Sequence, residues 1–159
     1  MRDSSNRRVR RGDQMAVVER SVLVGHSAER MYSLVEHVEA YPQFLPWCSG
    51  ADVSLREPGR TVATIHVNYH GVRQRFSTEN LNEDGCRIII RLLSGPFREL
   101  DGLWRFSALA ADASKVEFTL RYEISNRILE TLIGPVFNHI ANTFVEAFVQ
   151  RADQLYGAT

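Results

Sequence analysis

Histidine and cysteine are the residues of this sequence best suited to metal binding or nucleophilic chemistry, and their spacing supports neither. His66 and His70 lie four residues apart at the end of a segment rich in β-branched side chains. Four residues of an extended strand span about 13 Å at ~3.3 Å each, so these imidazoles cannot bind one metal ion together. The sequence also lacks the motifs G-x-S-x-G, C-x-x-C and H-E-x-x-H and a glycine-rich phosphate loop. We therefore predict no metal site and no catalytic residue.

The two cysteines, Cys48 and Cys86, are too few for a disulfide framework and match no metal-ligand spacing. A nucleophilic role would require a neighbouring base that the sequence does not identify, so we expect both to be small buried side chains. Their number favours a reducing compartment. No apolar run has the length of a signal peptide or a membrane-spanning helix. We expect a cytoplasmic protein, with peripheral contact to the inner membrane as an alternative.

Aromatic and proline residues cluster in two places where an apolar ligand could bind. The segment 41–48 (YPQFLPWC) holds three aromatic residues and two prolines, which restrict the backbone and hold the rings in place. A second set follows Gly95-Pro96, where Phe97, Trp104 and Phe106 lie on a segment with strand character. These rings either fill a core or line a gap between a sheet and a helix, and the residues alone leave both interpretations open.

The C-terminal segment 129–156 is the element that must position these rings. Its apolar residues recur at three- and four-residue steps, which predicts an α-helix with one broad apolar face. Gly134-Pro135 interrupts the pattern, so we expect a short helical turn, a break or kink, and a main helix from Pro135. Gly157 suits a left-handed cap. The apolar face is too wide for one neighbouring helix to cover, so it requires a sheet.

The residues before this helix supply the sheet. Ser27 is a suitable N-cap for a first helix, and a second short helix is expected over 38–44. Strands are predicted over 17–24, 51–56, 61–69, 72–81, 86–93, 97–109 and 115–124. Turns without intervening helices indicate an antiparallel, half-buried sheet. The predicted fold class is α+β, with a curved antiparallel sheet wrapped around the long C-terminal helix.

Length and charge restrict the remaining possibilities. The 159 residues suit one domain, which we assign to 15–159, and the net charge of zero argues against nucleic acid, DNA above all, as an obligate partner. Residues 1–14 contain five arginines and little apolar surface, so a disordered basic tail is expected. Met15 is a candidate for the biological start. The alternative is a basic arm that contacts anionic lipid or RNA.

Several motifs together resemble one family. Tyr41-Pro-x-Phe-Leu-Pro-Trp-Cys48 is similar to the hallmark of the coenzyme Q-binding, START-like family of the SRPBCC superfamily, also known as the ribosome association toxin (RatA) family. The segments 76–80 (FSTEN), 95–97 (GPF), 104–106 (WRF) and 134–142 (GPVFNHIAN) resemble its other marks. The resemblance extends from Met15 to about Tyr156. One departure is Asp101-Gly102-Leu103 before Trp104, which affects local detail only.

The resemblance implies a helix-grip fold with a hydrophobic cavity that binds an isoprenoid quinone or similar lipid in support of respiration. It also implies a transient membrane contact. The predicted cavity residues are Tyr41, Phe44, Trp47, His66, Arg75, Phe76, Trp104, Phe106, Phe137, Ile140 and Phe144. Among them, Tyr41, Trp47, His66 and Arg75 are candidate hydrogen-bond donors to the two quinone carbonyls.

The same resemblance leaves two other functions open. The toxin name implies binding to a ribosomal subunit and inhibition of subunit association, and clustered basic residues on the surface would favour it. Polyketide cyclases of the wider superfamily are enzymes, and convergent polar groups deep in the cavity would favour that function. We expect a lipid carrier or chaperone without chemistry of its own, with no catalytic cofactor.

Overall fold

A seven-stranded antiparallel sheet and a long C-terminal helix dominate the fold of the computed structural model, which describes residues 15–157. Along the chain the elements are β1 (Ala16–Val24), α2 (Ala28–Glu36), the 3-10 helix η1 (Val38–Gln43), β2 (Cys48–Glu57), β3 (Arg60–Tyr69), β4 (Val72–Glu83), β5 (Arg87–Ser94), β6 (Phe97–Ala110), β7 (Ala113–Ile124) and α3 (Arg127–Tyr156). The order across the sheet is β1-β7-β6-β5-β4-β3-β2. The predicted α+β fold class is confirmed. The assignment of residues 1–14 to a disordered tail lies outside the described residues.

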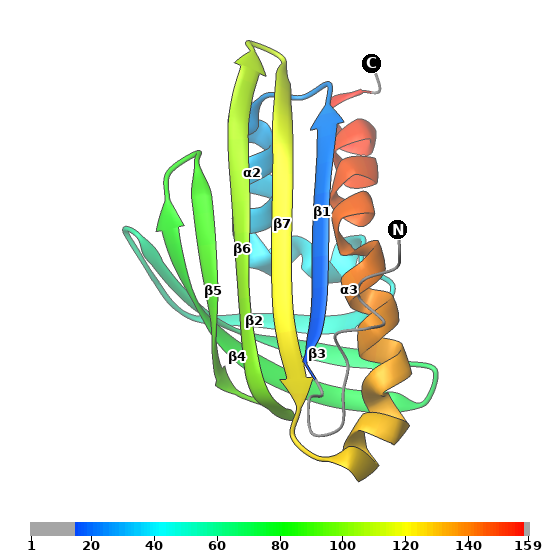
Figure 1. Ribbon diagram of the computed structural model, residues 1–159. Helices are drawn as coiled ribbons and strands as arrows, with labels where there is room; N and C mark the ends of the chain where they lie inside the picture. Colours follow the sequence, from blue (N-terminus) through cyan, green and yellow to red (C-terminus); the bar gives the residue numbers. More distant parts are fainter. Residues whose placement is uncertain (1–14, 158–159) are drawn as a thin grey trace.

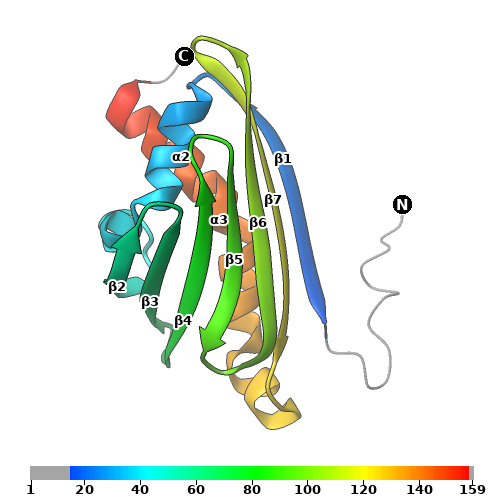
Figure 2. The same ribbon diagram turned by 90° about the vertical axis from the view of Figure 1, so that its left-hand side faces the viewer.

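The sheet is strongly curved, and both α-helices lie on its concave side (Figures 1 and 2). Register shifts interrupt the pairing of β2 with β3, β4 with β5, and β6 with β7. Such bulges bend a strand and increase its twist. The sheet thereby curls around α3, as the predicted width of the apolar helix face requires.

The strand pattern of the sequence sets which side chains face the helices. On β7, Val116, Phe118 and Tyr122 are buried. Lys115 and Arg121 alternate with them and are more exposed. Successive strand residues point to opposite faces, so this alternation places one face on the core and the other in solvent.

The two short helices form where the sequence predicts them. Ser27 caps α2, and its hydroxyl accepts a hydrogen bond from the backbone N–H of Arg30 at 3.1 Å. Met31, Leu34 and Val35 are buried on one face of α2. The second short helix is η1, which begins at Val38 and has 3-10 geometry.

Of the predicted break or kink at Gly134-Pro135, the break is wrong, because α3 runs continuously from Arg127 to Tyr156. Pro135 lacks an N–H and removes one helical hydrogen bond. Ile133 and Phe137 are buried on either side of it, so tertiary packing maintains the helix across the proline. Asn126 caps the helix by accepting from the N–H of Leu129 at 2.8 Å. At the other end, Gly157 has the predicted positive φ, 92°.

The cysteines differ from each other in environment. Cys48 is buried, as predicted, whereas Cys86 is exposed, because it precedes β5 in the turn after β4. Both are free thiols. None of the helices between residues 15 and 157 is long and apolar enough to cross a membrane.

Gly95 provides a test of the close packing between the β5–β6 turn and β4. Its φ is +146°, and a Cβ added there would lie 2.5 Å from the Cβ of Phe76. We expect Gly95→Ala to lower the free energy of unfolding by about 3 kcal/mol, from backbone strain and steric overlap. Urea denaturation measures this loss. Gly50→Ala is the matched control, since its Cβ would meet only the His66 ring at 3.4 Å; equal losses in the two variants would contradict the close approach.

Candidate ligand cavity

A cavity lies between α3, the segment after α2 and the concave face of the sheet. Its volume is about 100 Å³. The cavity is therefore narrow. The lining residues are Val35, Val38, Tyr41, Trp47, Ala63, Ile65, Phe76, Thr78, Asn80, Ile88, Ile90, Phe97, Leu100, Trp104, Phe118, Leu120, Tyr122, Phe137, Ile140, Ala141 and Phe144.

Seven of the eleven predicted cavity residues lie in this lining. Three of them come from α3, where spacings of three and four residues place them on one helix face. Two come from the proline-rich segment and two from the sheet. The seven are Tyr41, Trp47, Phe76, Trp104, Phe137, Ile140 and Phe144. Their contact with a ligand remains a prediction.

Two predicted aromatic residues pack beside the cavity rather than along it. Phe44 is half-buried against Phe148, with ring centroids 5.1 Å apart, and the guanidinium of Arg151 lies over its outer side. Phe106 is buried and contacts Tyr32 of α2 edge-on at 5.7 Å. Both rings belong to the core that α2 and the C-terminal half of α3 form with the sheet.

The placement of His66 and Arg75 in the cavity is wrong. The two residues pair across β3 and β4, and both side chains lie on the outer face of the sheet. Thr61, Ala63, Ile65 and Val67 are the buried positions of β3, so strand alternation directs His66 outward. His66 Nε2 lies 2.9 Å from Asp52 Oδ2.

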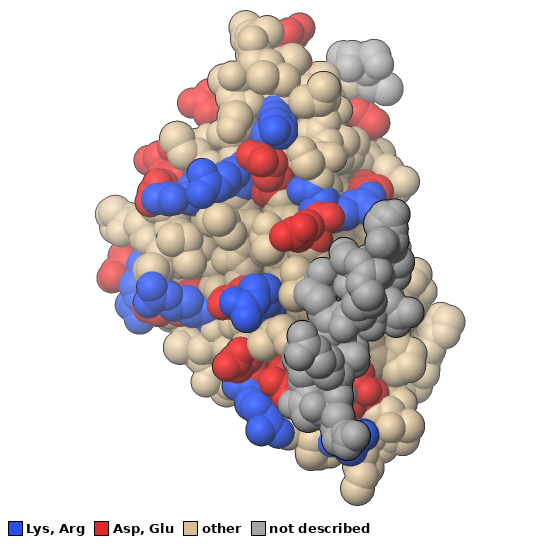
Figure 3. Space-filling view, in the orientation of Figure 1, with Lys and Arg blue, Asp and Glu red and all other residues tan. Residues whose placement is uncertain are grey.

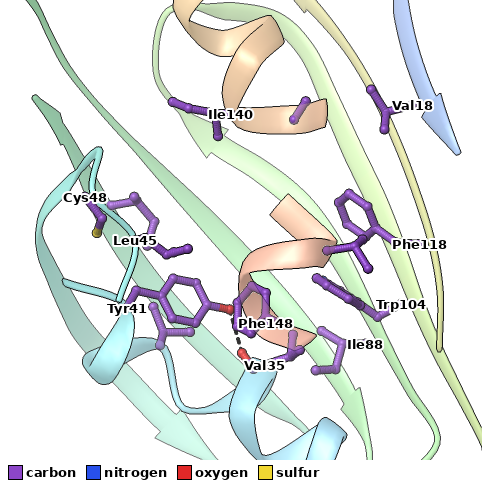
Figure 4. Close-up of a cluster of buried hydrophobic side chains, with 14 of the residues drawn as sticks. Val18, Val35, Tyr41, Leu45, Cys48, Ile88, Trp104, Phe118, Ile140 and Phe148 are labelled. Carbon is purple, nitrogen blue, oxygen red and sulfur yellow. Dashed lines mark hydrogen bonds between the residues drawn. The ribbon is translucent and has the colours of Figure 1, made fainter. Parts of the chain in front are cut away.

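Tyr41 lines the cavity, but its hydroxyl already has a partner. It donates a hydrogen bond of 2.6 Å to the carbonyl oxygen of Val35 (Figure 4). Burial raises the pKa of the Tyr41 phenol well above its ordinary value. The hydrogen bond fixes the ring edge-on against Phe148, with centroids 5.2 Å apart. Tyr41 therefore contributes an apolar ring to the wall, and its predicted role as a head-group donor is not supported.

An aromatic cluster forms the floor of the cavity. The Phe144 ring lies 5.7 Å from the Trp104 ring and 6.1 Å from that of Trp47, so one side chain of α3 joins both indoles. Phe118 contacts the Trp104 ring at 4.4 Å. Figure 4 shows Trp104, Phe118 and Ile88 on the sheet directed toward α3 and Phe148.

Three further residues with polar groups in the lining were not predicted. Thr78 and Asn80 of β4 face the cavity, and the Thr78 hydroxyl donates to Asn80 Oδ1 at 3.1 Å. Tyr122 of β7 is the third, and burial raises its pKa to about 12. The signal was present in the sequence, because Thr78 and Asn80 share strand parity with Phe76.

No charged side chain lines the cavity among the described residues. Across residues 15–157, no group of three or more His, Cys, Asp or Glu side chains is arranged to hold a metal ion. The lining can therefore enclose a mainly apolar molecule, and its neutral polar groups can donate hydrogen bonds to an oxygen atom of that molecule.

A curved antiparallel sheet that grips a long C-terminal helix around an apolar cavity defines the START-like, helix-grip class of proteins. A family model described as "Polyketide cyclase / dehydrase and lipid transport" matches residues 24–149, and the chain belongs to this family. The resemblance predicted from the segment 41–48 is confirmed.

Sequence relatives carry two kinds of name. The chain is 39% identical over 144 residues to the "Ribosome association toxin RatA" of Escherichia coli (strain K12), covering 91% of each protein. It is 28% identical over 141 residues to the "Coenzyme Q-binding protein COQ10 homolog B, mitochondrial" of Xenopus laevis, covering 86% of this chain and 58% of that protein.

Solved structures share the fold. A START superfamily protein from Mycobacterium smegmatis superposes with a TM-score of 0.71 at 25% identity, covering 87% of this chain and 98% of that one. The Zhui aromatase/cyclase from Streptomyces sp. R1128 gives 0.73 at 19% identity, covering 88% and 94%. At that identity the cyclase demonstrates a common fold alone.

The buried phenols predict alkaline instability. Burial raises the pKa of Tyr122 from its ordinary value of about 10 to about 12 in the folded protein. The stability that its neutral form contributes is fully present below pH 10 and is lost as the pH rises toward 12, since the unfolded chain releases the proton first. Between pH 8 and pH 11 the free energy of unfolding, measured by urea denaturation, should fall by about 1 kcal/mol less for Tyr122→Phe than for the parent. Tyr69→Phe, at a half-exposed position, is the control; identical pH profiles for the parent and Tyr122→Phe would contradict the prediction.

Proposed function

We propose that this protein binds an isoprenoid quinone, or a similar neutral lipid, and acts as a carrier or chaperone that supports respiration. The observation that carries the proposal is the narrow cavity lined by aromatic and aliphatic side chains. The family description, which includes lipid transport, and the relative named for coenzyme Q binding add support.

The energetics of transfer fit a carrier. Moving one isoprene unit from water into an apolar cavity is favourable by about 4 kcal/mol at ~0.8 kcal/mol per carbon. A quinone starts in a bilayer, however, so burial in the protein replaces burial in the membrane and the net change is near zero. A protein that must release its ligand requires such a balance.

A contact with the membrane surface is part of the proposal. Ile128 and Leu132 lie one turn apart at the start of α3, with 76% and 66% of their surface exposed. Arg127 beside them is exposed as well, which suits anionic lipid head groups. This end of the molecule projects beyond the sheet (Figure 1). We propose a cytoplasmic protein that binds the inner membrane transiently.

We infer that the protein performs no chemistry of its own. The polar groups that face the cavity are an amide and hydroxyls, and acid–base catalysis at neutral pH needs groups that titrate closer to 7. The relatives named above are a toxin and a coenzyme Q-binding protein, and the cyclase shares the fold alone. An enzyme of the cyclase type is the third candidate function, after the lipid carrier and the ribosome-binding protein.

Quenching of the two indoles tests quinone binding. Trp47 and Trp104 both line the cavity, and a quinone ring is an electron acceptor that quenches indole emission at contact. We expect a short-chain quinone to produce saturable quenching. Ala141→Leu, which adds volume at the cavity wall, should weaken binding at least about tenfold.

Ala147→Leu is the matched control, because Ala147 lies on the same helix outside the cavity lining and is half-buried. It should bind as the parent does. Linear quenching of the parent, equal to that of free tryptophan, would show that the cavity does not admit a quinone.

Association with a ribosomal subunit is the second candidate, and the identity to RatA favours it. On the face shown in Figure 3, acidic and basic side chains of the described residues are interspersed. Asp101 of β6, for example, pairs across the sheet with Arg91 on one side and Arg121 on the other.

Gradient profiles separate the two functions. For a lipid carrier, overproduction leaves the ratio of whole ribosomes to free subunits unchanged, and we expect this result at physiological salt because the net charge is zero. Accumulation of free subunits, with the purified protein co-sedimenting on one of them, would place ribosome binding first.

A further inference from the structure

The inner face of β4 carries polar side chains where neighbouring strands carry apolar ones. Thr78, Asn80 and Asn82 occur at two-residue steps on the concave side, and Thr61 of β3 pairs with Asn80. We call these four residues the polar ladder. The concave positions that flank it are Ala63, Ile65, Ile88 and Ile90. A row of polar groups in an apolar wall requires an explanation, since burial of a polar group costs free energy unless it is hydrogen-bonded.

Hydrogen bonds within the polar ladder satisfy only some of its donor and acceptor groups. The Thr78 hydroxyl donates to Asn80 Oδ1 at 3.1 Å, and Asn82 Nδ2 donates to the Thr61 hydroxyl at 3.0 Å. Asn82 Oδ1 is buried without a partner. Asn80 Nδ2 has no hydrogen-bond partner among the described residues and belongs to a side chain that lines the cavity. Two N–H donors therefore face the cavity on an amide whose oxygen Thr78 already holds.

We propose that Asn80, positioned by Thr78, is the head-group site of the cavity and donates a hydrogen bond to an uncharged acceptor oxygen of the ligand. This inference rests on the proposed function and specifies the ligand that the cavity accepts. A carbonyl or ether oxygen on an otherwise apolar molecule satisfies the free donors of Asn80.

The uncharged lining of the cavity disfavours lipids with an anionic head group. A fatty acid or phospholipid that entered with its head group would bury an anion, and no cationic side chain of the described chain lines the cavity to neutralise it. The cavity therefore favours a neutral ligand, and under the proposed function this ligand is a prenylated ring whose carbonyl oxygens accept hydrogen bonds from Asn80.

Two ligands that differ only in their oxygens test the inference. The first is a ubiquinone with two isoprene units, and the second is a benzene ring with the same tail and no ring oxygens. We expect Asn80→Leu to weaken quinone binding about tenfold by calorimetry and to change binding of the benzene by less than about twofold. Thr78→Val should weaken quinone binding less, because it releases the amide without removing its donors.

Stability gives an independent measurement on the same variant. Asn80→Leu removes an amide with unused donors from an apolar wall, so its melting temperature without ligand should equal or exceed that of the parent. Asn68→Leu is the matched control for the change of side chain, because Asn68 is exposed on β3. It should bind both ligands as the parent does. If Asn80→Leu does not fold, Asn80→Ala provides the same comparison of the two ligands.

The outcomes distinguish this inference from the proposed function. If the parent binds neither ligand, the proposed function fails, and the inference with it. If the parent binds both ligands and Asn80→Leu weakens the binding of both equally, or of neither, ligand binding by the cavity is supported and the role of Asn80 is overturned. A fatty acid of the same tail length that binds the parent as tightly as the quinone would overturn the restriction to neutral ligands.

Discussion

Aromatic packing between α3 and the concave face of the sheet is the interaction on which the rest of the structure depends. Phe148 is fully buried, and its ring meets those of Tyr41 and Trp104 at 5.2 and 5.4 Å. At this end α2 also covers the sheet and the core is filled. One turn earlier, Phe144 marks the transition, because it packs on Phe148 and also lines the cavity. Toward the start of α3 the helix face lines a space that the curved sheet and one helix cannot close.

The principal features of the fold were predictable because they depend on periodicity. Three- and four-residue spacing identifies α3, and alternation on β7 gives its buried face correctly. The continuity of α3 across Gly134-Pro135 was not predictable in this way. A local rule gives the cost of Pro135, whereas the burial of Ile133 and Phe137 around it becomes visible only in three dimensions.

The candidate site was predictable for its rings and not for its polar groups. Large aromatic residues such as Trp47 and Trp104 are informative in a sequence, and both line the cavity. His66 was chosen for its chemistry, although alternation along β3 directs it outward. Asn80 was overlooked because a polar residue on a strand ordinarily faces solvent. Its parity with Phe76 was the available signal.

The polar ladder breaks the local rule that a cavity wall of this kind is apolar, and such exceptions occur where function requires them. Asn80 bears donors that the described protein leaves unused, within a wall that is mainly apolar. Under the proposed function, the fold supplies apolar burial, which is similar in the membrane, and the polar ladder is proposed to distinguish one neutral lipid from another.

Mass spectrometry of the lipid that remains bound through purification from the native host tests the central claim most directly. The account predicts a neutral isoprenoid quinone, retained by the parent protein and depleted in Asn80→Leu. Recovery of a fatty acid or phospholipid as the bound species, or of no lipid from a folded parent protein, would contradict it.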